Sequence, residues 1–251
     1  MKTNHNQLRT ALFAVTVLVL LTSALTHADY IYVAIHGDGT IRKFDSSGNI
    51  STFASGLSYP SGLAFDSIGN LYVSLCHNGT IEKFDPSGHI MSVFASGVGT
   101  PYGLTFDSSD NLYAANADNG TIDKFDSNGN RSTFASGLGC PAGLAFDSTR
   151  YLYAGCQDSK TIEKFDSSGN RSTFASALWC PTGLAFDSGS NLYVANWGAG
   201  TIEKFDSSGN GSIFASGLDS PVFIAVQVPE PASAMIMALG ATIISLRRRK
   251  C

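Results

Sequence analysis

The chain has few of the residues and motifs on which common catalytic sites depend. It contains five histidines, and two of them, His5 and His27, fall in the N-terminal segment. Only His36, His77 and His89 remain elsewhere for acid–base chemistry. No G-x-S-x-G, H-E-x-x-H or P-loop sequence occurs, which argues against the enzyme and nucleotide-binding classes that those motifs mark.

Basic residues are scarce in the central part of the chain. Residues 29–229 include 10 lysines and arginines against 19 aspartates and glutamates, so this segment is about nine charges negative. The whole chain has a formal net charge of only −4, because its other basic residues lie near the two ends. Nucleic-acid binding needs a basic footprint, so the composition predicts no nucleic-acid partner. A divalent cation or a cationic partner is compatible with this charge but is not required by it.

A long aliphatic helix pattern is missing as well, and in its place a unit of about forty residues is written five times. The phenylalanine of a K-F-D triplet recurs with steps of 40, 41, 40 and 40 residues, at Phe44, Phe84, Phe125, Phe165 and Phe205. The proline that opens each unit recurs at Pro60, Pro101, Pro141, Pro181 and Pro221. A period of this length with four short strands in it predicts the blades of a β-propeller.

The unit that begins at Pro181 shows how one blade is built. Segments 183–187, 192–196, 201–206 and 212–218 are rich in Val, Ile, Tyr, Phe and Thr, which favours strands. Asp, Ser, Gly and Asn fill the turns between them. One such sheet cannot bury its own faces, so we expect aromatic residues to fill the space between neighbouring blades.

The strand count predicts five blades of four strands. The first unit lacks its opening strand and begins at 30–34, whereas the last unit supplies only an opening strand, at 221–226. The C-terminal strand would then complete the blade that the N-terminal strands begin, which removes the open sheet edge of a linear array. We therefore expect an all-β, five-bladed propeller of four-stranded blades with short apolar helices at both ends of the chain.

The N-terminal residues have the pattern of a secretory signal peptide. Lys2 and Arg9 precede an apolar stretch at 11–21, and a small-residue site ends at Ala28, where we expect cleavage. An uncleaved anchor is the weaker alternative, because the apolar stretch is short for a membrane span.

The C-terminal residues carry a second targeting pattern. Pro229, Glu230 and Pro231 are followed by an apolar run of 15 residues at 232–246 and then by four consecutive basic residues at 247–250. This run predicts a short membrane helix whose basic end stays in the cytoplasm.

These C-terminal features resemble the PEP-CTERM sorting signal of Gram-negative bacteria. The matching parts are V-P-E-P-A-S at 228–233, the apolar helix and the basic cluster, in that order. The resemblance implies recognition of Pro229, Glu230 and Pro231 by an exosortase, transient anchoring in the inner membrane, and delivery to the cell surface or extracellular matrix. The expected domains are a signal peptide at 1–28, a propeller at 29–228 and a sorting segment at 229–251, with signal peptidase and exosortase as processing partners.

The repeat itself resembles the NHL repeat, through P-x-G-L-A-F-D, G-N-L-Y-V-A and T-I-E-K-F-D-x-x-G. The resemblance covers the whole central segment and implies a propeller but no particular chemistry. Propellers of this group usually have six blades or more, so a count of five is a departure from the pattern. Whether the ring closes within one chain stays open.

Comparison of the five units predicts where a ligand would bind. The turns after G-L-A-F-D and after K-F-D hardly change, whereas the loops before the opening proline and after the second strand vary. The variable loops would lie together around one mouth of the central channel, which we name the variable end. Binding residues usually lie on loops that a rigid scaffold holds, although drift at loosely packed positions explains the variation equally well. The candidate binding residues are His36, Tyr59, His77, Tyr102, Asn116, Asp118, Asp158, Trp179, Asn196 and Trp197.

Four of the five cysteines belong to these variable loops. Cys251 lies in the C-terminal tail, and the others are Cys76, Cys140, Cys156 and Cys180. In an oxidising compartment a disulfide between two of the four is plausible, with three ways of pairing all of them. Metal binding by these cysteines is the weaker alternative, because no ligand spacing repeats.

Three functions remain open. The favoured one is a non-enzymatic surface propeller that binds polysaccharide or protein at its variable end and needs no cofactor. The second is an enzyme similar to the gluconolactonases or streptogramin lyases, with a divalent metal at the channel held by Asn116, Asp118, Asp158 and Asn196. No glutamate lies in those loops, since all three glutamates of the central segment belong to the repeated T-I-E-K strand. The third is a purely structural spacer.

Overall fold

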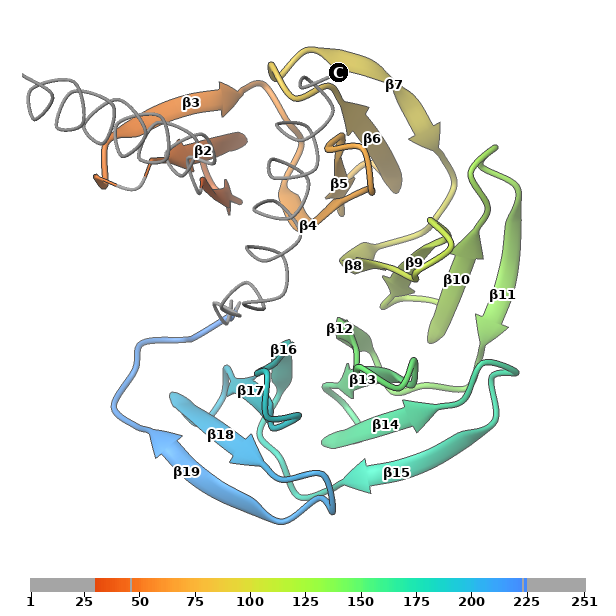
Figure 1. Cartoon of the computed structure of the whole chain (residues 1–251), viewed down its shortest axis with the longest axis vertical. Coiled ribbons are helices and arrows are strands. Elements are labelled where there is room, and N and C mark those ends of the chain that lie inside the picture. The colour runs from red at the N-terminus through yellow and green to blue at the C-terminus, as the bar shows by residue number, and fades with distance from the viewer. Residues whose placement is uncertain (1–29, 46, 223, 225–251) are drawn as a thin grey trace, which may run out of the picture.

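The computed structural model describes residues 30–45, 47–222 and 224. In this part of the chain, nineteen strands form five antiparallel sheets that are arranged around a common axis (Figure 1). Four sheets have four strands, and the sheet formed by the first three strands has three. The protein is an all-β, five-bladed propeller, as the repeat period predicts.

The strands of blades 1 and 2 are β1 (Ile31–Ile35), β2 (Thr40–Phe44), β3 (Ile50–Ala54), β4 (Pro60–Phe65), β5 (Leu71–Leu75), β6 (Thr80–Phe84) and β7 (Ile90–Ala95). Those of blade 3 are β8 (Pro101–Phe106), β9 (Leu112–Asn116), β10 (Thr121–Phe125) and β11 (Arg131–Ala135). Those of blades 4 and 5 are β12 (Pro141–Phe146), β13 (Leu152–Cys156), β14 (Thr161–Phe165), β15 (Arg171–Ala175), β16 (Pro181–Phe186), β17 (Leu192–Asn196), β18 (Thr201–Phe205) and β19 (Gly211–Ala215). Neighbouring strands in sequence are neighbours in each sheet, so every blade is a simple meander.

The conserved D-S-S-G-N turns hold themselves together by local hydrogen bonds. In the turn after β14, Asp166 Oδ1 accepts from the backbone N–H groups of Ser168 and Asn170, at 2.9 and 3.0 Å, and Asn170 Nδ2 donates to Asp166 Oδ2 at 2.7 Å. Gly169 takes a φ of +82°, which disfavours a side chain. Hydrogen bonds from Asn170 lower the pKa of Asp166, so the carboxylate is ionised and serves as a structural cap.

Aromatic rings join each blade to the next. Tyr153 of blade 4 packs edge-on against Phe174 of its own blade and Phe186 of blade 5, with ring centroids 5.1 and 4.9 Å apart. Phe174 also contacts Phe205 of blade 5, at 6.1 Å. Equivalent triples are formed by Tyr32 with Phe53 and Phe65, Tyr72 with Phe94 and Phe106, and Tyr113 with Phe134 and Phe146. The aromatic positions of the repeat therefore form the contacts between blades, as the sequence predicts.

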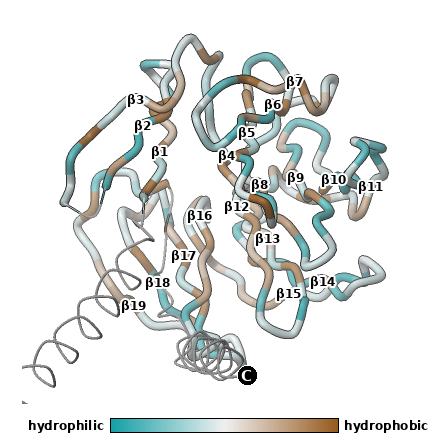
Figure 2. Tube along the Cα trace, turned by 45° about the horizontal axis from the view of Figure 1, so that its top comes forward, coloured by the Kyte–Doolittle hydropathy of each residue, from teal (hydrophilic) through white to brown (hydrophobic). Residues whose placement is uncertain are grey.

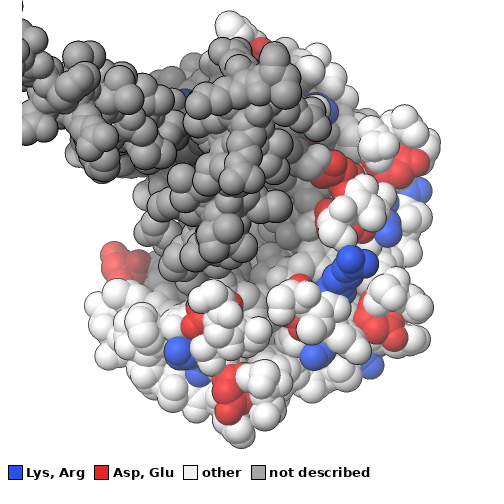
Figure 3. Space-filling model, in the orientation of Figure 1, with Lys and Arg blue, Asp and Glu red and all other residues white. Residues whose placement is uncertain are grey.

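Figure 2 shows the resulting distribution of hydropathy along the chain, with hydrophobic residues within the strands and hydrophilic residues in many of the turns. On the face seen in Figure 3, acidic and basic residues are interspersed over the described part of the surface.

The innermost strands approach one another so closely that the glycine of P-x-G-L has no room for a side chain. A Cβ on Gly62, Gly103 or Gly143 would lie less than 3.0 Å from a backbone carbonyl oxygen of the next inner strand. These oxygens belong to Tyr102, Ala142 and Thr182, respectively. The glycines thus set the narrow spacing of β4, β8, β12 and β16 around the axis.

The predicted closing strand falls partly outside the described residues. Pro221, Val222 and Ile224 are described but form no regular strand, whereas 223 and 225–228 are not described. The hydroxyl of Thr182 donates to the carbonyl of Pro221 at 3.1 Å, and Ile224 lines the same cavity as residues of β1 and β16. At the outer part of this seam, Phe214 is 63% exposed and contacts Tyr193, and within the described residues it meets no aromatic ring of blade 1. Complete closure of the ring stays a prediction.

The predicted signal peptide, sorting segment and terminal helices lie outside the described residues. In residues 30–45, 47–222 and 224, no helix is long and apolar enough to cross a membrane.

Candidate functional site

The two kinds of variable loop lie at one end of the propeller. In the four complete blades, the second strand leads into one variable loop, and the fourth strand leads into the connection to the next blade. Because successive strands are antiparallel, both connections leave from the same end, opposite the D-S-S-G-N turns. This arrangement agrees with the variable end that the sequence predicts.

A pocket of about 610 Å³ opens at this end of the channel, and all five blades contribute to it. Three aromatic side chains, those of His36, Tyr102 and Trp197, line it together with the amide of Gln157. The remaining lining residues are small, apolar or neutral polar: Ala34, Pro60, Ser61, Gly103, Ala142, Cys180, Thr182 and Val222. The pocket therefore offers flat apolar faces with a few neutral hydrogen-bonding groups.

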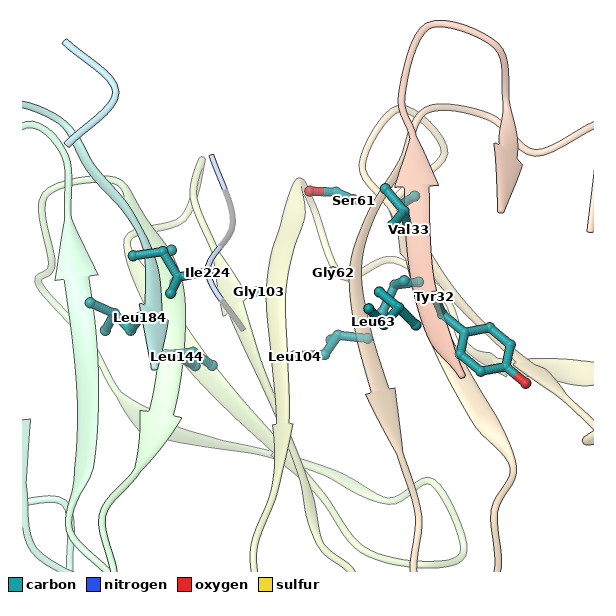
Figure 4. Close-up of a pocket in the computed structure, with 14 residues that line it drawn as sticks. Tyr32, Val33, Ser61, Gly62, Leu63, Gly103, Leu104, Leu144, Leu184 and Ile224 are labelled. Carbon is teal, nitrogen blue, oxygen red and sulfur yellow. The ribbon is translucent and has the colours of Figure 1, made fainter. Parts of the chain in front are cut away.

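Below this mouth lies a cavity of about 410 Å³ whose lining side chains are mostly apolar. Each inner strand places one aliphatic residue at the same repeat position, and the C-terminal segment supplies the fifth, so the ring consists of Leu63, Leu104, Leu144, Leu184 and Ile224 (Figure 4). The side chains of this ring thus form an apolar floor beneath the mouth.

The variable x of P-x-G contributes one residue per blade to the mouth. These residues are Ser61, Tyr102, Ala142, Thr182 and Val222. Among them only Tyr102 is predicted from the sequence, and Gln157 is missed as well. The residue at x differs from blade to blade, whereas the rest of the P-x-G-L segment hardly changes. This variation is the sequence signal that identifies the set.

Aromatic residues outside the pocket form two further groups on the variable end. Tyr59 is 47% exposed and lies between His36 and His77, with ring centroids 4.8 and 5.1 Å away. Trp179 is 59% exposed, and the Lys160 ammonium lies 4.6 Å from its ring centroid. Tyr59, His77 and Trp179 thus flank the mouth without lining the pocket, whereas His36 lines it.

The residue just before the opening proline is often held in the left-handed region. Tyr59, Cys140, Cys180 and Ser220 have φ values of 53°, 52°, 52° and 48°. This conformation costs a non-glycine residue roughly 1–2 kcal/mol. Packing of the inner strands against one another stabilises it, and the loops at the mouth are correspondingly fixed in direction.

Two predicted binding residues are structural instead. Asn116 and Asn196 are fully buried at the ends of β9 and β17, where they face the third strand of their own blade. The side chain of Asn116 donates to Asp123 at 3.3 Å and that of Asn196 to Glu203 at 2.9 Å. Neither asparagine lines the pocket at the mouth, because the pleat turns the last side chain of these strands towards the third strand.

The two carboxylates of the predicted metal set, Asp118 and Asp158, belong to the loops that follow β9 and β13 in blades 3 and 4. Asp118 accepts a hydrogen bond from the Thr100 hydroxyl, and Asp158 is exposed in its loop. Within the described residues, no group of three or more His, Cys, Asp or Glu side chains is arranged to hold a metal ion.

The four cysteines of the variable loops are free thiols in the described structure. The Cys76 thiol is directed at the carbonyl of Tyr59, at 3.3 Å, and the Cys140 thiol at the side-chain oxygen of Gln157, at 3.4 Å. Cys156 is fully buried at the end of β13. The predicted disulfide is therefore not formed here.

Burial raises the pKa of three side chains near the mouth. Burial raises the pKa of the Cys76 and Cys140 thiols, so neither is a thiolate at neutral pH. Burial also raises the pKa of Tyr102, which keeps its hydroxyl as a neutral hydrogen-bond donor. His36 is the one imidazole among the described lining residues.

No protein-family model matches the chain, and no curated protein sequence matches it. Several solved structures resemble it in fold. Virginiamycin B lyase from Staphylococcus aureus superposes with a TM-score of 0.67 at 17% sequence identity, covering 81% of this chain and 73% of the lyase chain. A chain of the nidogen/laminin complex gives a TM-score of 0.72 at 21% identity, with 80% and 82% covered.

A gluconolactonase from Xanthomonas campestris is similar to the same degree, with a TM-score of 0.69 at 17% identity, covering 78% of this chain and 75% of that chain. The neighbours thus include two enzymes and a chain of the nidogen/laminin complex. Identities this low show the propeller fold and leave function to the site.

Proposed function

We propose that the protein is an exported cell-surface propeller that binds a neutral polysaccharide at its variable end without catalysing a reaction. The observation that supports this most strongly is the composition of the mouth pocket. Flat aromatic faces from Tyr102 and Trp197 stand beside neutral hydrogen-bonding groups on Gln157, Ser61 and Thr182. Sugar rings present apolar C–H faces and many hydroxyls, so such a lining suits them better than it suits a charged ligand.

Export and surface delivery form part of the proposal and depend on the two terminal segments. Signal peptidase would cleave after Ala28, and an exosortase would recognise Pro229, Glu230 and Pro231. In this scheme the propeller reaches the surface or matrix of a Gram-negative cell after a transient stay in the inner membrane.

A glycan array with the purified protein tests the binding function. We expect binding to neutral glycans, and we expect Trp197→Ala to lower the affinity about tenfold or more, because a buried tryptophan contact is typically a hot spot. Trp179→Ala is the matched control, since Trp179 lies at the same end but does not line the pocket. Equal losses in the two variants, or no glycan bound, would contradict the proposal, and binding of a surface protein instead would change the ligand class.

An enzyme is the second candidate, supported by His36 in the mouth and by the fold shared with the lyase and the gluconolactonase. Turnover of a streptogramin or a lactone that disappears in His36→Ala would favour it. A divalent cation that raises the melting temperature of the protein would indicate that such an enzyme uses a metal.

A further inference from the structure

Four of the five blades carry an acidic residue at the same position of their third strand. These residues are Glu82, Asp123, Glu163 and Glu203, and blade 1 has Arg42 there instead. In each case the acid follows the isoleucine of T-I-x-K-F and belongs to the part of the sheet that faces the neighbouring blade. The blades differ in what neutralises this carboxylate.

In blades 3 and 4 an arginine of the fourth strand pairs with this carboxylate. Arg131 is paired with Asp123, with Nη2 2.7 Å from Oδ2, and its Nη1 donates to the carbonyl of Gly97 in blade 2 at 2.8 Å. Arg171 has its Nε 3.8 Å from Glu163 Oε2, and its Nη1 donates to the carbonyl of Gly137 in blade 3 at 3.1 Å. Each guanidinium thus joins a carboxylate of its own blade to a carbonyl of the preceding one.

Blade 5 has the carboxylate but lacks the arginine. The residue opposite Phe205 in β19 is Gly211, whereas Arg131 and Arg171 are the residues opposite Phe125 and Phe165. The space between blades 4 and 5 is an open pocket of about 480 Å³. Its lining consists of Phe174, Ala175, Ser176, Glu203, Phe205, Gly209, Gly211, Ser212 and Ile213.

The residue that supplies the second acceptor of the arginine sites has a counterpart in blade 4, which precedes blade 5. Ala177 corresponds to Gly97 and Gly137, and all three residues have left-handed φ values, of 64°, 64° and 68°. The shared φ indicates that the chain turns in the same way at Ala177, next to the lining residue Ser176, as at the two glycines whose carbonyls accept from Arg131 and Arg171. A non-glycine residue rarely adopts this conformation, so its retention at Ala177 argues that the local geometry is kept.

Glu203 has no cationic partner within the described residues. Its one polar contact there is the hydrogen bond that Asn196 Nδ2 donates to Oε1 at 2.9 Å. Partial burial raises the pKa of Glu203 above its ordinary value, as expected for a carboxylate that lacks a counter-charge.

We infer that the pocket between blades 4 and 5 binds a guanidinium group, which Glu203 and the Ala177 carbonyl hold as their counterparts hold Arg171. The pocket is open to solvent, so the group comes from outside this chain's described part, either from a free alkylguanidine or from an arginine side chain on a peptide. A planar guanidinium spreads its N–H donors over three nitrogen atoms in a fixed fork, so it can reach the carboxylate and the carbonyl at once. An ammonium carries its three donors on a single nitrogen atom, so the site should prefer a guanidinium. This site is separate from the mouth and does not depend on what the mouth binds.

Titration of the purified protein with agmatine, followed by NMR or calorimetry at constant low ionic strength, tests the site. We expect saturable binding that Glu203→Gln weakens about tenfold or more, because charge-assisted hydrogen bonds to the carboxylate are lost. Glu82→Gln is the matched control, since Glu82 occupies the same repeat position but has Ile90 where the arginine would stand. Putrescine, an amine without a guanidinium, should bind more weakly than agmatine.

Two further experiments determine which kind of molecule supplies the guanidinium group and whether the group binds in this pocket. A peptide with an exposed arginine that binds more tightly than agmatine, and more tightly than the same peptide with lysine, would identify a protein ligand. Tighter binding of agmatine than of the arginine peptide would identify a small alkylguanidine. Gly211→Arg should abolish binding, because the new side chain fills the pocket. Its Cβ would displace the Phe205 ring, so circular dichroism is used to check that this variant is folded. Absence of saturable binding, equal binding by Glu203→Gln, or equal affinity for putrescine would overturn the inference.

Discussion

Replacement of Gly143 by alanine is the sharpest test of how the inner strands pack. The new Cβ would lie less than 3.0 Å from the carbonyl oxygen of Thr182, a separation that real Cβ atoms essentially never show. The obstacle is backbone in the neighbouring blade, so the strands β12 and β16 must move apart. Gly143 is not among the residues with positive φ, and the cost is therefore steric.

The magnitude follows from the general cost of overpacking. Inserting one carbon into a well-packed region typically costs about 1–3 kcal/mol, and a clash with backbone places this variant at about 3 kcal/mol. For a domain of this size, such a loss lowers the melting temperature by about 6–12 °C. Gly37→Ala is the matched control, since nothing lies within 4 Å of a Cβ built there.

Urea unfolding followed by tryptophan fluorescence measures both variants. We expect a clear drop in the free energy of unfolding for Gly143→Ala and a change within about 0.5 kcal/mol for Gly37→Ala. If Gly143→Ala were as stable as the control, the inner strands would have to lie farther apart than described, and the narrow channel would not exist.

Three further predictions concern stability and reactivity. Phe174→Ala should lower the free energy of unfolding by about 3–5 kcal/mol, since Phe174 joins blade 4 to blade 5. Phe214 is 63% exposed, so Phe214→Ala should lower it much less. Equal losses in urea unfolding would contradict the different packing of these two phenylalanines. The pKa of Asp85 is lowered to about 2 by hydrogen bonds from Ser87 and the His89 amide. Because the folded pKa lies below the ordinary value, this stabilisation is present above about pH 4 and lost as the pH falls towards about 2. A urea midpoint that stays constant over this interval would contradict it. Finally, burial raises the pKa of Cys156 to about 12, so alkylation mapped by mass spectrometry should modify Cys140 well before Cys156 in the folded protein, and a disulfide between them would leave both unmodified until reduction.

The sequence predicts the strands and turns well because the repeat supplies five copies of each local signal. T-I-E-K-F gives β6, β14 and β18 at the expected places, and the D-S-S-G-N turns form their aspartate caps as expected. The variable end is also correctly identified, because antiparallel alternation alone decides which loops share an end.

The sequence fails where side-chain direction decides the outcome. Asn116 and Asn196 occur in variable loops by position, yet each is the last residue of its strand and faces inward to an acid. Ser61, Thr182 and Gln157 reach the mouth although no catalytic or aromatic character distinguishes them in the sequence. The pocket beside Glu203 is visible only when the filled sites of blades 3 and 4 are compared with it in three dimensions.

Hydrogen exchange of the purified protein with and without its best glycan tests most directly whether the variable end is the binding surface. The binding function predicts slower exchange at residues 34–36, 61, 102–103 and 196–197, which line or flank the mouth, and unchanged exchange in the D-S-S-G-N turns at the other end. Protection confined to those turns, or to the outer rim of the blades, would contradict it.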